Sequence, residues 1–223
     1  MTTKKPTKKP AAKKVKISEI KRWPLYRIST SVRGFDQVLG GGIVRGSLTV
    51  LSGPPGSGKT RLCLQALDAI AAFGVKTLFV SSEQPVKDLA KICKQLELRY
   101  VTLKNCVNSD ELLDLVDKNG VVVIDTVNGF VSSPKEISEL VTALREATCK
   151  DVTIIVIAHV NRAGNLAGPR DLAHMADVLV SLDSSRSDPR TRVLDASVKN
   201  RFATTDRQFA TTQLRLDATG KFL

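Results

Sequence analysis

The chain has 223 residues, of which 42% are hydrophobic and 25% are charged, and its formal net charge is +12. This length is sufficient for one globular domain with a large core, which needs no disulfide or metal to stabilise it. No apolar run reaches the length of a membrane span, and the N-terminus lacks the apolar segment of a secretory signal. We therefore expect a cytoplasmic protein with no membrane partner.

The four cysteines are widely spaced and form no C-x-x-C pair, which excludes a zinc ribbon or a disulfide framework as the expected organisation. They are Cys63, Cys93, Cys106 and Cys149. We expect free thiols in a reducing compartment.

The positive charge is concentrated near the N-terminus. Residues 1–22 contain nine Lys or Arg and one acid, Glu19, whereas the other 201 residues contain 25 basic and 21 acidic side chains. Such a segment buries too little apolar surface to order itself, so we expect a disordered basic arm followed by one domain at 23–223. The arm is interpreted as a nucleic-acid contact, with a solubilising tail and a targeting peptide as alternatives.

Strand and helix patterns alternate after the arm. A short helix is expected at 32–39, capped by Thr30 and Ser31 and ended by the glycines at 40–42. Apolar periodicity predicts strands at 48–52, 76–81, 100–103, 121–124, 152–158, 177–182, 192–199 and 208–216, and helices at 59–73, 85–96, 110–118 and 134–147. The last three strands follow without helices long enough for further crossovers. The predicted fold class is α/β, a mainly parallel twisted sheet flanked by helices, with a C-terminal antiparallel extension.

Residues 53–60 read GPPGSGKT directly after a predicted strand and before a predicted helix. This is the spacing of the P-loop, whose backbone N–H groups surround nucleotide phosphates at the positive end of a helix. Lys59 is expected to reach the β- and γ-phosphates, and the Thr60 hydroxyl is expected to bind Mg²⁺. The sequence thus predicts a nucleoside triphosphate site that includes Gly53, Pro54, Pro55, Gly56, Ser57, Gly58, Lys59, Thr60 and Arg61.

Three further candidate residues follow other predicted parallel strands, whose carboxyl ends form the ligand-binding edge of such a sheet. Asp125 follows a run of buried aliphatic residues and is predicted to hold Mg²⁺ opposite Thr60. Glu83 is the candidate general base that activates a water at the γ-phosphate. Its alternative role is an exposed acid at a helix N-terminus. His159 is a candidate γ-phosphate sensor, with an ordinary hydrogen-bonded histidine as the alternative.

Several segments together resemble the ATPase core of the RecA superfamily. They are RIST at 27–30, FDQVLGGGIV at 35–44, the P-loop, VSSE at 80–83 and VIDT at 123–126. The segments AHV at 158–160, AGPR at 167–170, HMAD at 174–177 and KNRF at 199–202 resemble the bacterial RadA (Sms) family of recombination ATPases. The resemblance covers about residues 25–218 and implies a RecA-like P-loop NTPase core that uses ATP and Mg²⁺.

This resemblance implies a homo-oligomeric ring, hexameric as its expected form, with ATP bound between neighbouring subunits. Lys199 and Arg201 occupy the place of a basic pair that reaches the neighbour's γ-phosphate in this superfamily. Strand alternation puts both side chains on one face, which suits joint contact with a phosphate. Two exposed bases at a strand end are the alternative.

The resemblance also implies that the loops at 127–134 and 161–171 line the ring channel and bind single-stranded DNA. The second loop contains Arg162 and Arg170 among small residues, which suits backbone tracking. We expect a DNA-stimulated ATPase that acts on single-stranded or branched DNA in recombination, repair or replication, with partners among the proteins of those processes. The alternative is a KaiC-like assembly or helicase loader that ATP switches without translocation.

Three features depart from the RadA pattern. The lysine-rich segment stands where that family has a four-cysteine zinc finger, and no Lon-protease-like domain lies within the 223 residues. Ala203 replaces the glycine that usually follows KNRF. We expect a specialised core, nucleoid-associated or acting in a phage-infected cell, in which the basic arm replaces DNA contacts made elsewhere in the family.

Overall fold

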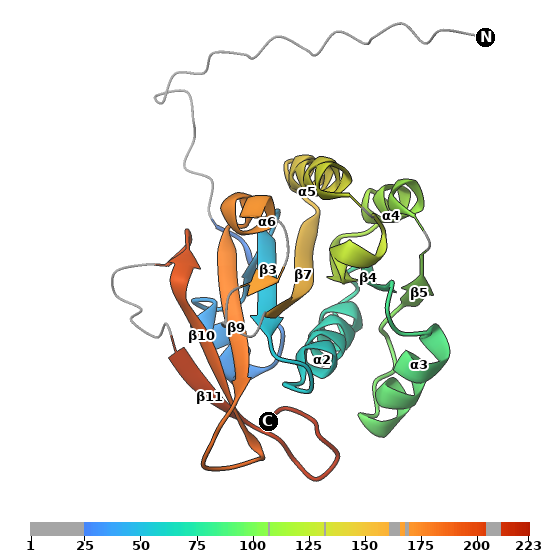
Figure 1. The fold of residues 1–223 in the computed structure, drawn as a ribbon. Helices are drawn as coiled ribbons and strands as arrows, with labels where there is room; N and C mark the ends of the chain where they lie inside the picture. Colours follow the sequence, from blue (N-terminus) through green and yellow to red (C-terminus); the bar gives the residue numbers. More distant parts are fainter. Residues whose placement is uncertain (1–24, 107, 132, 161–165, 168–169, 204–210) are drawn as a thin grey trace, which may run out of the picture.

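A computed structural model describes residues 25–106, 108–131, 133–160, 166–167, 170–203 and 211–223 (Figure 1). The predicted basic arm at 1–22 lies outside the described residues. Within the described part, no helix is both long and apolar enough to cross a bilayer. All four cysteines are thiols rather than disulfides, as predicted.

The centre of the molecule is a nine-stranded sheet with the order β11-β10-β9-β3-β7-β6-β4-β5, to which β8 adds beside β7. Its strands are β3 (Leu48–Gly53), β4 (Thr77–Ser81), β5 (Leu103–Asn105), β6 (Val121–Asp125), β7 (Thr153–Val160), β8 (Leu166–Ala167), β9 (Val178–Ser184), β10 (Thr191–Asn200) and β11 (Thr211–Arg215). A separate two-stranded sheet pairs β1 (Arg27–Ile28) with β2 (Ile43–Val44).

The sheet is parallel from β9 through β3, β7, β6 and β4 to β5, and antiparallel at β10, β11 and β8. This confirms the predicted class of a mainly parallel sheet with an antiparallel extension. One part of the prediction was wrong, because the strand expected at 177–182 pairs parallel with β3. A six-residue helix, α6 (Arg170–Met175), lies in the crossover that leads to it, and its pattern is too short to stand out in the sequence.

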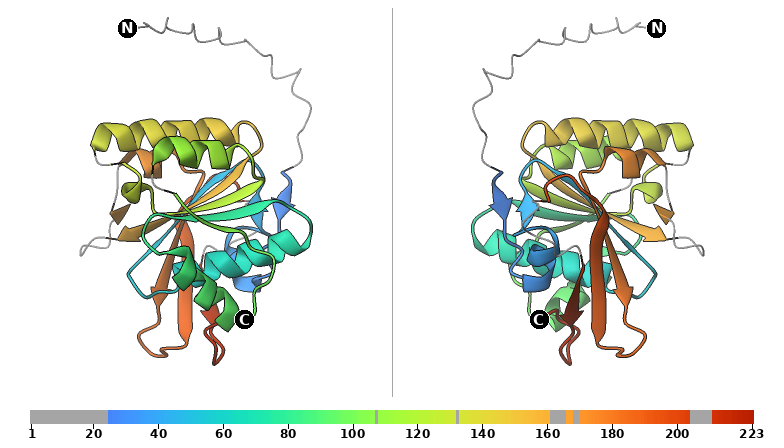
Figure 2. Two further views of the ribbon diagram at one scale, coloured as in Figure 1. Left: turned by 90° about the vertical axis from the view of Figure 1, so that its right-hand side faces the viewer. Right: turned by 90° about the vertical axis from the view of Figure 1, so that its left-hand side faces the viewer.

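Helices cover both faces of the sheet (Figure 2). Buried side chains from α1 (Arg33–Val38), α2 (Lys59–Ala72) and α3 (Val86–Gln95) join one core cluster, and those from α4 (Ser109–Val116), α5 (Pro134–Thr148) and α6 join a second. Strand β6 contributes Val121 and Val123 to the first cluster and Val122 and Ile124 to the second. Burial on both faces explains why the central strands are continuous apolar runs.

An expected helix cap and an expected strand start differ from the structure for local reasons. Helix α1 begins after Val32 without a side-chain cap, because the Asp36 carboxylate accepts bonds from the Thr30 amide and hydroxyl at 2.9 and 2.7 Å. Strand β5 begins at Leu103 rather than at residue 100. One oxygen of Asp68 accepts bonds from the amides of residues 99–101, which holds that segment as a loop.

Candidate nucleotide-binding site

Four strands end at the same edge of the sheet and bring the predicted site residues together. The P-loop follows β3, Glu83 follows β4, Asp125 ends β6, and His159 lies near the end of β7. A cavity of about 690 Å³ opens at this edge, within the usual range for a small-molecule site. The residues that line it are Pro55, Gly56, Gly58, Lys59, Thr60, Arg61, Glu83, Gln84, Ile92, Gln95, Asp125, Ile157, His159, Arg190, Arg192, Leu216, Asp217, Ala218, Thr219, Gly220 and Phe222.

The P-loop backbone turns into α2 at Gly58, which has a φ of 104°. A Cβ at this position would also lie 3.1 Å from the ring of Phe222, so both the conformation and the space require glycine. Lys59 is the first residue of α2, and its buried ammonium donates bonds to the carbonyls of Gly53 and Pro54 at 2.8 and 2.9 Å. The loop therefore already encloses a cation where phosphates are expected.

Burial lowers the pKa of Lys59, and this effect is opposed by the negative charges of Asp125 and Glu83. Burial likewise raises the pKa of Asp125, while the hydrogen bond from Thr60 and the nearby His159 and Lys59 act in the opposite direction. Burial removes both groups from water, and this loss of hydration disfavours their charged forms. Bound phosphates would balance the positive charge of Lys59, and a bound divalent cation would balance the negative charge of Asp125.

The two expected Mg²⁺ ligands, Thr60 and Asp125, are 65 residues apart in the sequence but are in contact in the structure. The Thr60 hydroxyl donates to the Asp125 carboxylate at 3.1 Å, and Asp125 is 3% exposed. Among the described residues, no group of three or more His, Cys, Asp or Glu is placed to hold a metal ion. One hydroxyl and one carboxylate fit Mg²⁺, which usually keeps waters and phosphate oxygens as its other ligands.

Glu83 and His159 lie beside this pair. One oxygen of the Glu83 carboxylate accepts a hydrogen bond from the Thr126 hydroxyl at 3.3 Å. The other oxygen lies 3.4 Å from Nε2 of His159. Helix α3 begins only at Val86, so Glu83 is not in its first turn. This geometry favours a role at the cavity over the alternative of a helix N-terminal acid. Nδ1 of His159 is buried and has no partner within the described part of the chain.

The remaining predicted P-loop residues have structural contacts of their own. Gly53 and Pro54 contribute the carbonyls that bind Lys59, and Ser57 is 1% exposed. Gly53, Pro54 and Ser57 do not line the cavity, whereas Pro55, Gly56 and Gly58 do. The Arg61 side chain extends to the Thr219 carbonyl and to Gln95.

Two contributors to the site were missed in the sequence. Arg192 of β10 donates through Nε to the carbonyl of Ser57 at 2.8 Å, so it ties the P-loop to the antiparallel extension. The C-terminal segment at 216–222 forms one wall of the cavity. A single arginine in a strand carries no pattern, and the only signal in the C-terminal segment is the turn composition of Asp217 to Gly220.

Lys199 and Arg201 lie where the parallel strands begin, whereas their own P-loop lies where β3 ends. Strand β10 runs antiparallel to β9, and its last residues pair with the beginning of β9. Lys199 donates to the carbonyls of Ala173 and His174 at 2.8 Å each, and Arg201 contacts the same His174 carbonyl at 3.5 Å. Both side chains thus contact the same carbonyl, but β10 ends at Asn200, so the expected strand alternation does not extend to Arg201.

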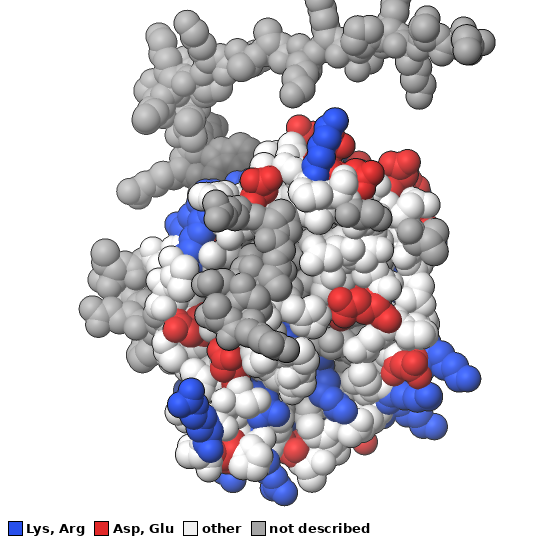
Figure 3. Space-filling view, in the orientation of Figure 1, with Lys and Arg blue, Asp and Glu red and all other residues white. Residues whose placement is uncertain are grey.

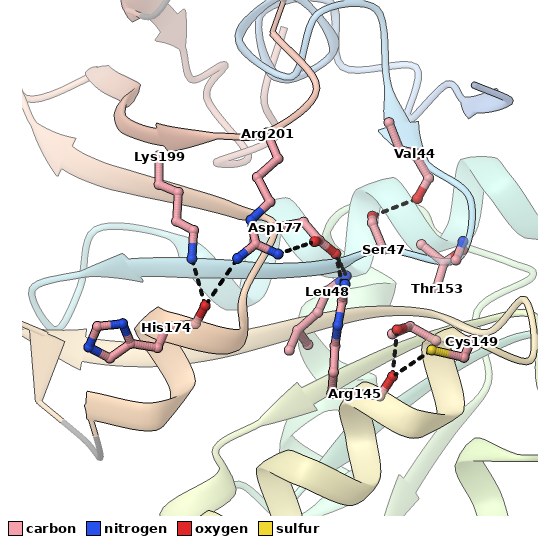
Figure 4. A network of polar contacts seen from close by, with 12 residues as sticks. Val44, Ser47, Leu48, Arg145, Cys149, Thr153, His174, Asp177, Lys199 and Arg201 are labelled. Atoms are coloured by element: carbon pink, nitrogen blue, oxygen red, sulfur yellow. Dashed lines mark hydrogen bonds and ion pairs between the residues drawn. The ribbon is translucent and has the colours of Figure 1, made fainter. Parts of the chain in front are cut away.

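Arg201 also belongs to an ion-pair network around Asp177, whose side chain is 4% exposed. Arg201 lies 3.2 Å from one carboxylate oxygen, and the other accepts bonds from Arg145 and from the Leu48 amide (Figure 4). Burial and the charge of Arg201 lower the pKa of Lys199. These contacts show that neither base is a free strand-end charge in the isolated chain.

The predicted DNA-binding residues are only partly described. Arg162 lies outside the described residues, and Arg170 is the first residue of α6. The other predicted DNA loop contains a short 3₁₀ helix at Val127–Gly129, and both Val127 and Phe130 are buried.

The chain is similar to proteins of known families. The sequence profile of the KaiC ATPase family matches residues 28–118. The DNA repair protein RadA of Salmonella typhimurium is 35% identical over 202 residues, covering 84% of this chain and 43% of that protein. RadA of Mycobacterium tuberculosis is 31% identical over 216 residues, covering 88% and 44%. The chain spans less than half of the length of the curated relatives it matches.

Solved structures show the same fold. A KaiC-like protein from Pyrococcus horikoshii superimposes with a TM-score of 0.73 at 20% identity, covering 90% of this chain and 99% of that one. The RadB recombinase superimposes with a TM-score of 0.67 at 22% identity, covering 86% and 97%. The match to the KaiC ATPase family and the identity with RadA show that the chain belongs to the RecA superfamily of ATPases and is homologous to part of RadA.

Proposed function

We propose that this chain hydrolyses ATP between subunits of a homo-oligomeric ring and that DNA stimulates this reaction, in repair, recombination or replication. The observation that supports it is the meeting of Lys59, Thr60, Asp125, Glu83 and His159 at one cavity. These groups supply a phosphate-binding cation, a metal-binding pair and a candidate base in the arrangement that phosphoryl transfer requires.

Each of these residues has a proposed part in hydrolysis. Lys59 would leave the carbonyls of Gly53 and Pro54 and bind the β- and γ-phosphates. Thr60 and Asp125 would hold Mg²⁺, which neutralises charge on the phosphates when it is bound. Glu83 would orient the attacking water and accept its proton, while the Thr126 hydroxyl holds the carboxylate in place. His159 contacts the same carboxylate and would report the state of the γ-phosphate to the following loop.

The basic pair supports a site that is completed by a neighbour. Lys199 and Arg201 lie at the edge of the sheet where the parallel strands begin, whereas the P-loop lies at the edge where they end. Within one subunit the two bases are therefore remote from the cavity. In a head-to-tail ring this edge of one subunit would face the cavity of the next. Arg201 would then exchange its contact with Asp177 for the neighbour's γ-phosphate, and hydrolysis would depend on assembly.

The proposed DNA contacts are the basic arm at 1–22 and the loop that contains Arg162 and Arg170. Figure 3 shows acidic side chains gathered over α4 and α5, and these helices carry Asp110, Asp114, Glu139 and Glu146. Lys118 and Lys135 pair with Asp114 and Glu139, but acids outnumber bases on the two helices, so that face would repel a polyanion at low salt. DNA binding would therefore depend on the arm and on the channel loops rather than on this outer surface.

Stimulation of ATP hydrolysis by single-stranded DNA tests the proposal. At low salt we expect the rate to rise when single-stranded DNA is added to the wild-type chain. Glu83→Gln should still bind ATP but lose about 10²- to 10⁴-fold in turnover with and without DNA, because the amide cannot accept the proton. Turnover is measured by phosphate release, with Glu139→Gln on the exposed face of α5 as the matched control. Wild-type turnover in Glu83→Gln would assign the base elsewhere.

The salt dependence of DNA binding tests the arm. Residues 1–22 have a charge balance of +8, so their removal should reduce the slope of log affinity against log salt by roughly 5 to 6 for single-stranded DNA. Affinity is measured by fluorescence anisotropy over a salt series, with the full chain as reference. Equal slopes would identify the arm as a solubilising tail.

A second candidate function is a nucleotide-switched assembly without translocation. The match to the KaiC ATPase family and the fold of the KaiC-like protein favour it. It predicts that ATP changes the oligomeric state, measured by light scattering, while DNA leaves the hydrolysis rate unchanged. The DNA-stimulation measurement above therefore separates the two functions.

A further inference from the structure

A second and smaller cavity opens at the edge of the sheet where the parallel strands begin. Its volume is about 260 Å³, and it is lined by residues 71 and 74–77 at the junction of α2 and β4, by Tyr100 and Thr102 before β5, and by Asn119 after α4. The 14 residues of α2 place it about 20 Å from the P-loop, which precedes that helix. This cavity is therefore distinct from the candidate nucleotide-binding site.

Thr77 gives this cavity a polar group that the fold leaves unpaired. Thr77 is 4% exposed, and its hydroxyl makes no hydrogen bond within the described part of the chain. Burying a hydroxyl without a partner destabilises the folded state. A ligand atom that bonds to Thr77 would remove this cost, and Thr102 and Asn119 add further polar side chains to the lining.

The ring of Tyr100 lies at the same cavity on a fixed backbone. Asp68 of α2 accepts hydrogen bonds from the amides of residues 99, 100 and 101 at 2.8, 2.5 and 3.0 Å. Tyr100 is nevertheless 59% exposed, and Phe73, next to Gly74 of the lining, is 79% exposed. Neither ring belongs to the core. An exposed aromatic side chain on a fixed segment offers its face for stacking at a small cost in entropy.

The basic side chains at this cavity are available to an anion. Lys76 lines the cavity and Arg99 precedes Tyr100, and neither forms an ion pair with another described residue. Among the described residues that line the cavity, none is acidic. Asp117, close to Asn119 in the sequence, is already paired with Lys150 at 3.1 Å. An anionic ligand with an aromatic ring would complement these groups.

We propose that this cavity binds one nucleotide through its base and its phosphate. The base would stack on Tyr100 and bond to the Thr77 hydroxyl. The phosphate would pair with Lys76 and Arg99. A volume of about 260 Å³ has room for one heterocyclic base and is below the usual range for a site that encloses a whole drug-sized ligand.

The two sources of this ligand chemistry are a single DNA strand and a free mononucleotide. The inference goes beyond the proposed hydrolysis of ATP, because it concerns the opposite edge of the sheet and none of the groups assigned to the reaction. With a DNA strand as the source, the cavity would add an anchoring point to those proposed for the arm and the channel loops.

Photo-cross-linking to the full chain tests the site directly, because it reports which residue contacts the base. The probes are 5-iodouracil within an oligodeoxythymidylate strand and 5-iodo-dUMP as the free nucleotide. We expect irradiation to attach the base to Tyr100, which mass spectrometry of the digested protein locates. An adduct from the strand supports a unit of single-stranded DNA as the ligand, and an adduct from 5-iodo-dUMP supports a mononucleotide.

The absence of an adduct on Tyr100 with both probes would overturn the inference, whether or not other residues are labelled. Adducts on the P-loop or on the channel loops report the sites of the proposed function and are found in other peptides. Failure of the cavity and failure of the proposed function are therefore distinguishable.

Thr77→Val gives a second test of the same site. Valine has the shape of threonine without the unpaired hydroxyl, so the melting temperature should stay unchanged or rise. The probe concentration that gives half-maximal adduct on Tyr100 should increase about fivefold, as expected for the loss of one hydrogen bond to the base. A purely structural role of Thr77 would leave that concentration unchanged, which would contradict the inference.

Thr49→Val is the matched control. Thr49 lies on β3 and is 1% exposed, and its hydroxyl likewise has no partner among the described residues, but it does not line this cavity. Its half-maximal probe concentration should equal that of the wild type. An equal increase in both variants would show a general effect of the substitution and would also contradict the inference.

Discussion

Replacing Lys59 by alanine is expected to abolish tight ATP binding. The ammonium of Lys59 is buried at the start of α2 and lies next to the carbonyls of the P-loop. Its removal takes away the cation that balances the phosphates in a poorly hydrated site. Truncating one partner of such a charge pair costs about 2–5 kcal/mol, which corresponds to a loss of roughly 30- to 5,000-fold in affinity. Isothermal calorimetry with AMP-PNP, a non-hydrolysable ATP analogue, measures the change in affinity.

Lys91→Ala is the matched control for this experiment. Lys91 lies on α3, its side chain is 70% exposed, and it forms an ion pair with Asp88 at 2.8 Å. Its loss should leave nucleotide affinity unchanged, because an exposed pair of this kind contributes little. Circular dichroism would check that both variants remain folded. Unchanged affinity in Lys59→Ala would mean that the P-loop assignment is wrong.

Replacing Arg201 by alanine is expected to leave ATP binding within about twofold of wild type and to reduce turnover by about 10³- to 10⁵-fold. The reason is that the proposed role of Arg201 is to stabilise the transition-state charge in the neighbouring subunit. Binding is measured by calorimetry and turnover by phosphate release at a concentration that supports assembly. Turnover close to that of the wild type would remove Arg201 from the reaction.

Loss of the Asp177 ion pair is the competing explanation for that variant, and Arg145→Ala separates the two. Arg145 contacts the other oxygen of the Asp177 carboxylate, so its removal also disturbs this buried network. We expect Arg145→Ala to lower thermal stability and to retain turnover per folded subunit. If both variants lose turnover equally, the network supports the fold and Arg201 has no role in trans.

Mixing the two inactive variants completes the test. In a mixed assembly, an Arg201→Ala subunit offers an intact P-loop, and an adjacent Lys59→Ala subunit offers an intact Arg201. Partial recovery of turnover is expected on mixing, because some interfaces then carry both groups. A mixture that stays inactive although light scattering shows assembly would contradict hydrolysis at a shared interface.

The P-loop and the parallel strands were predictable because their signals are local. The eight residues at 53–60 specify a tight turn between strand and helix, and apolar runs such as 121–124 occur where a strand is buried on both faces. The rule that ligands lie at the carboxyl ends of parallel strands then placed Glu83, Asp125 and His159 at one edge. The expected helix cap at Thr30 and the expected strand start at residue 100 were wrong, because the side chains of Asp36 and Asp68 bind those backbone segments.

Pairings between distant residues required the tertiary structure. The contact of Thr60 with Asp125 and that of Arg192 with Ser57 depend on strand order, which sequence periodicity does not contain. The same holds for the C-terminal segment at 216–222, since its turn composition does not indicate that it packs on α2 and forms one wall of the cavity. Local sequence specifies which backbone shape each segment prefers, whereas packing of the sheet and its helices decides which segments meet at the nucleotide.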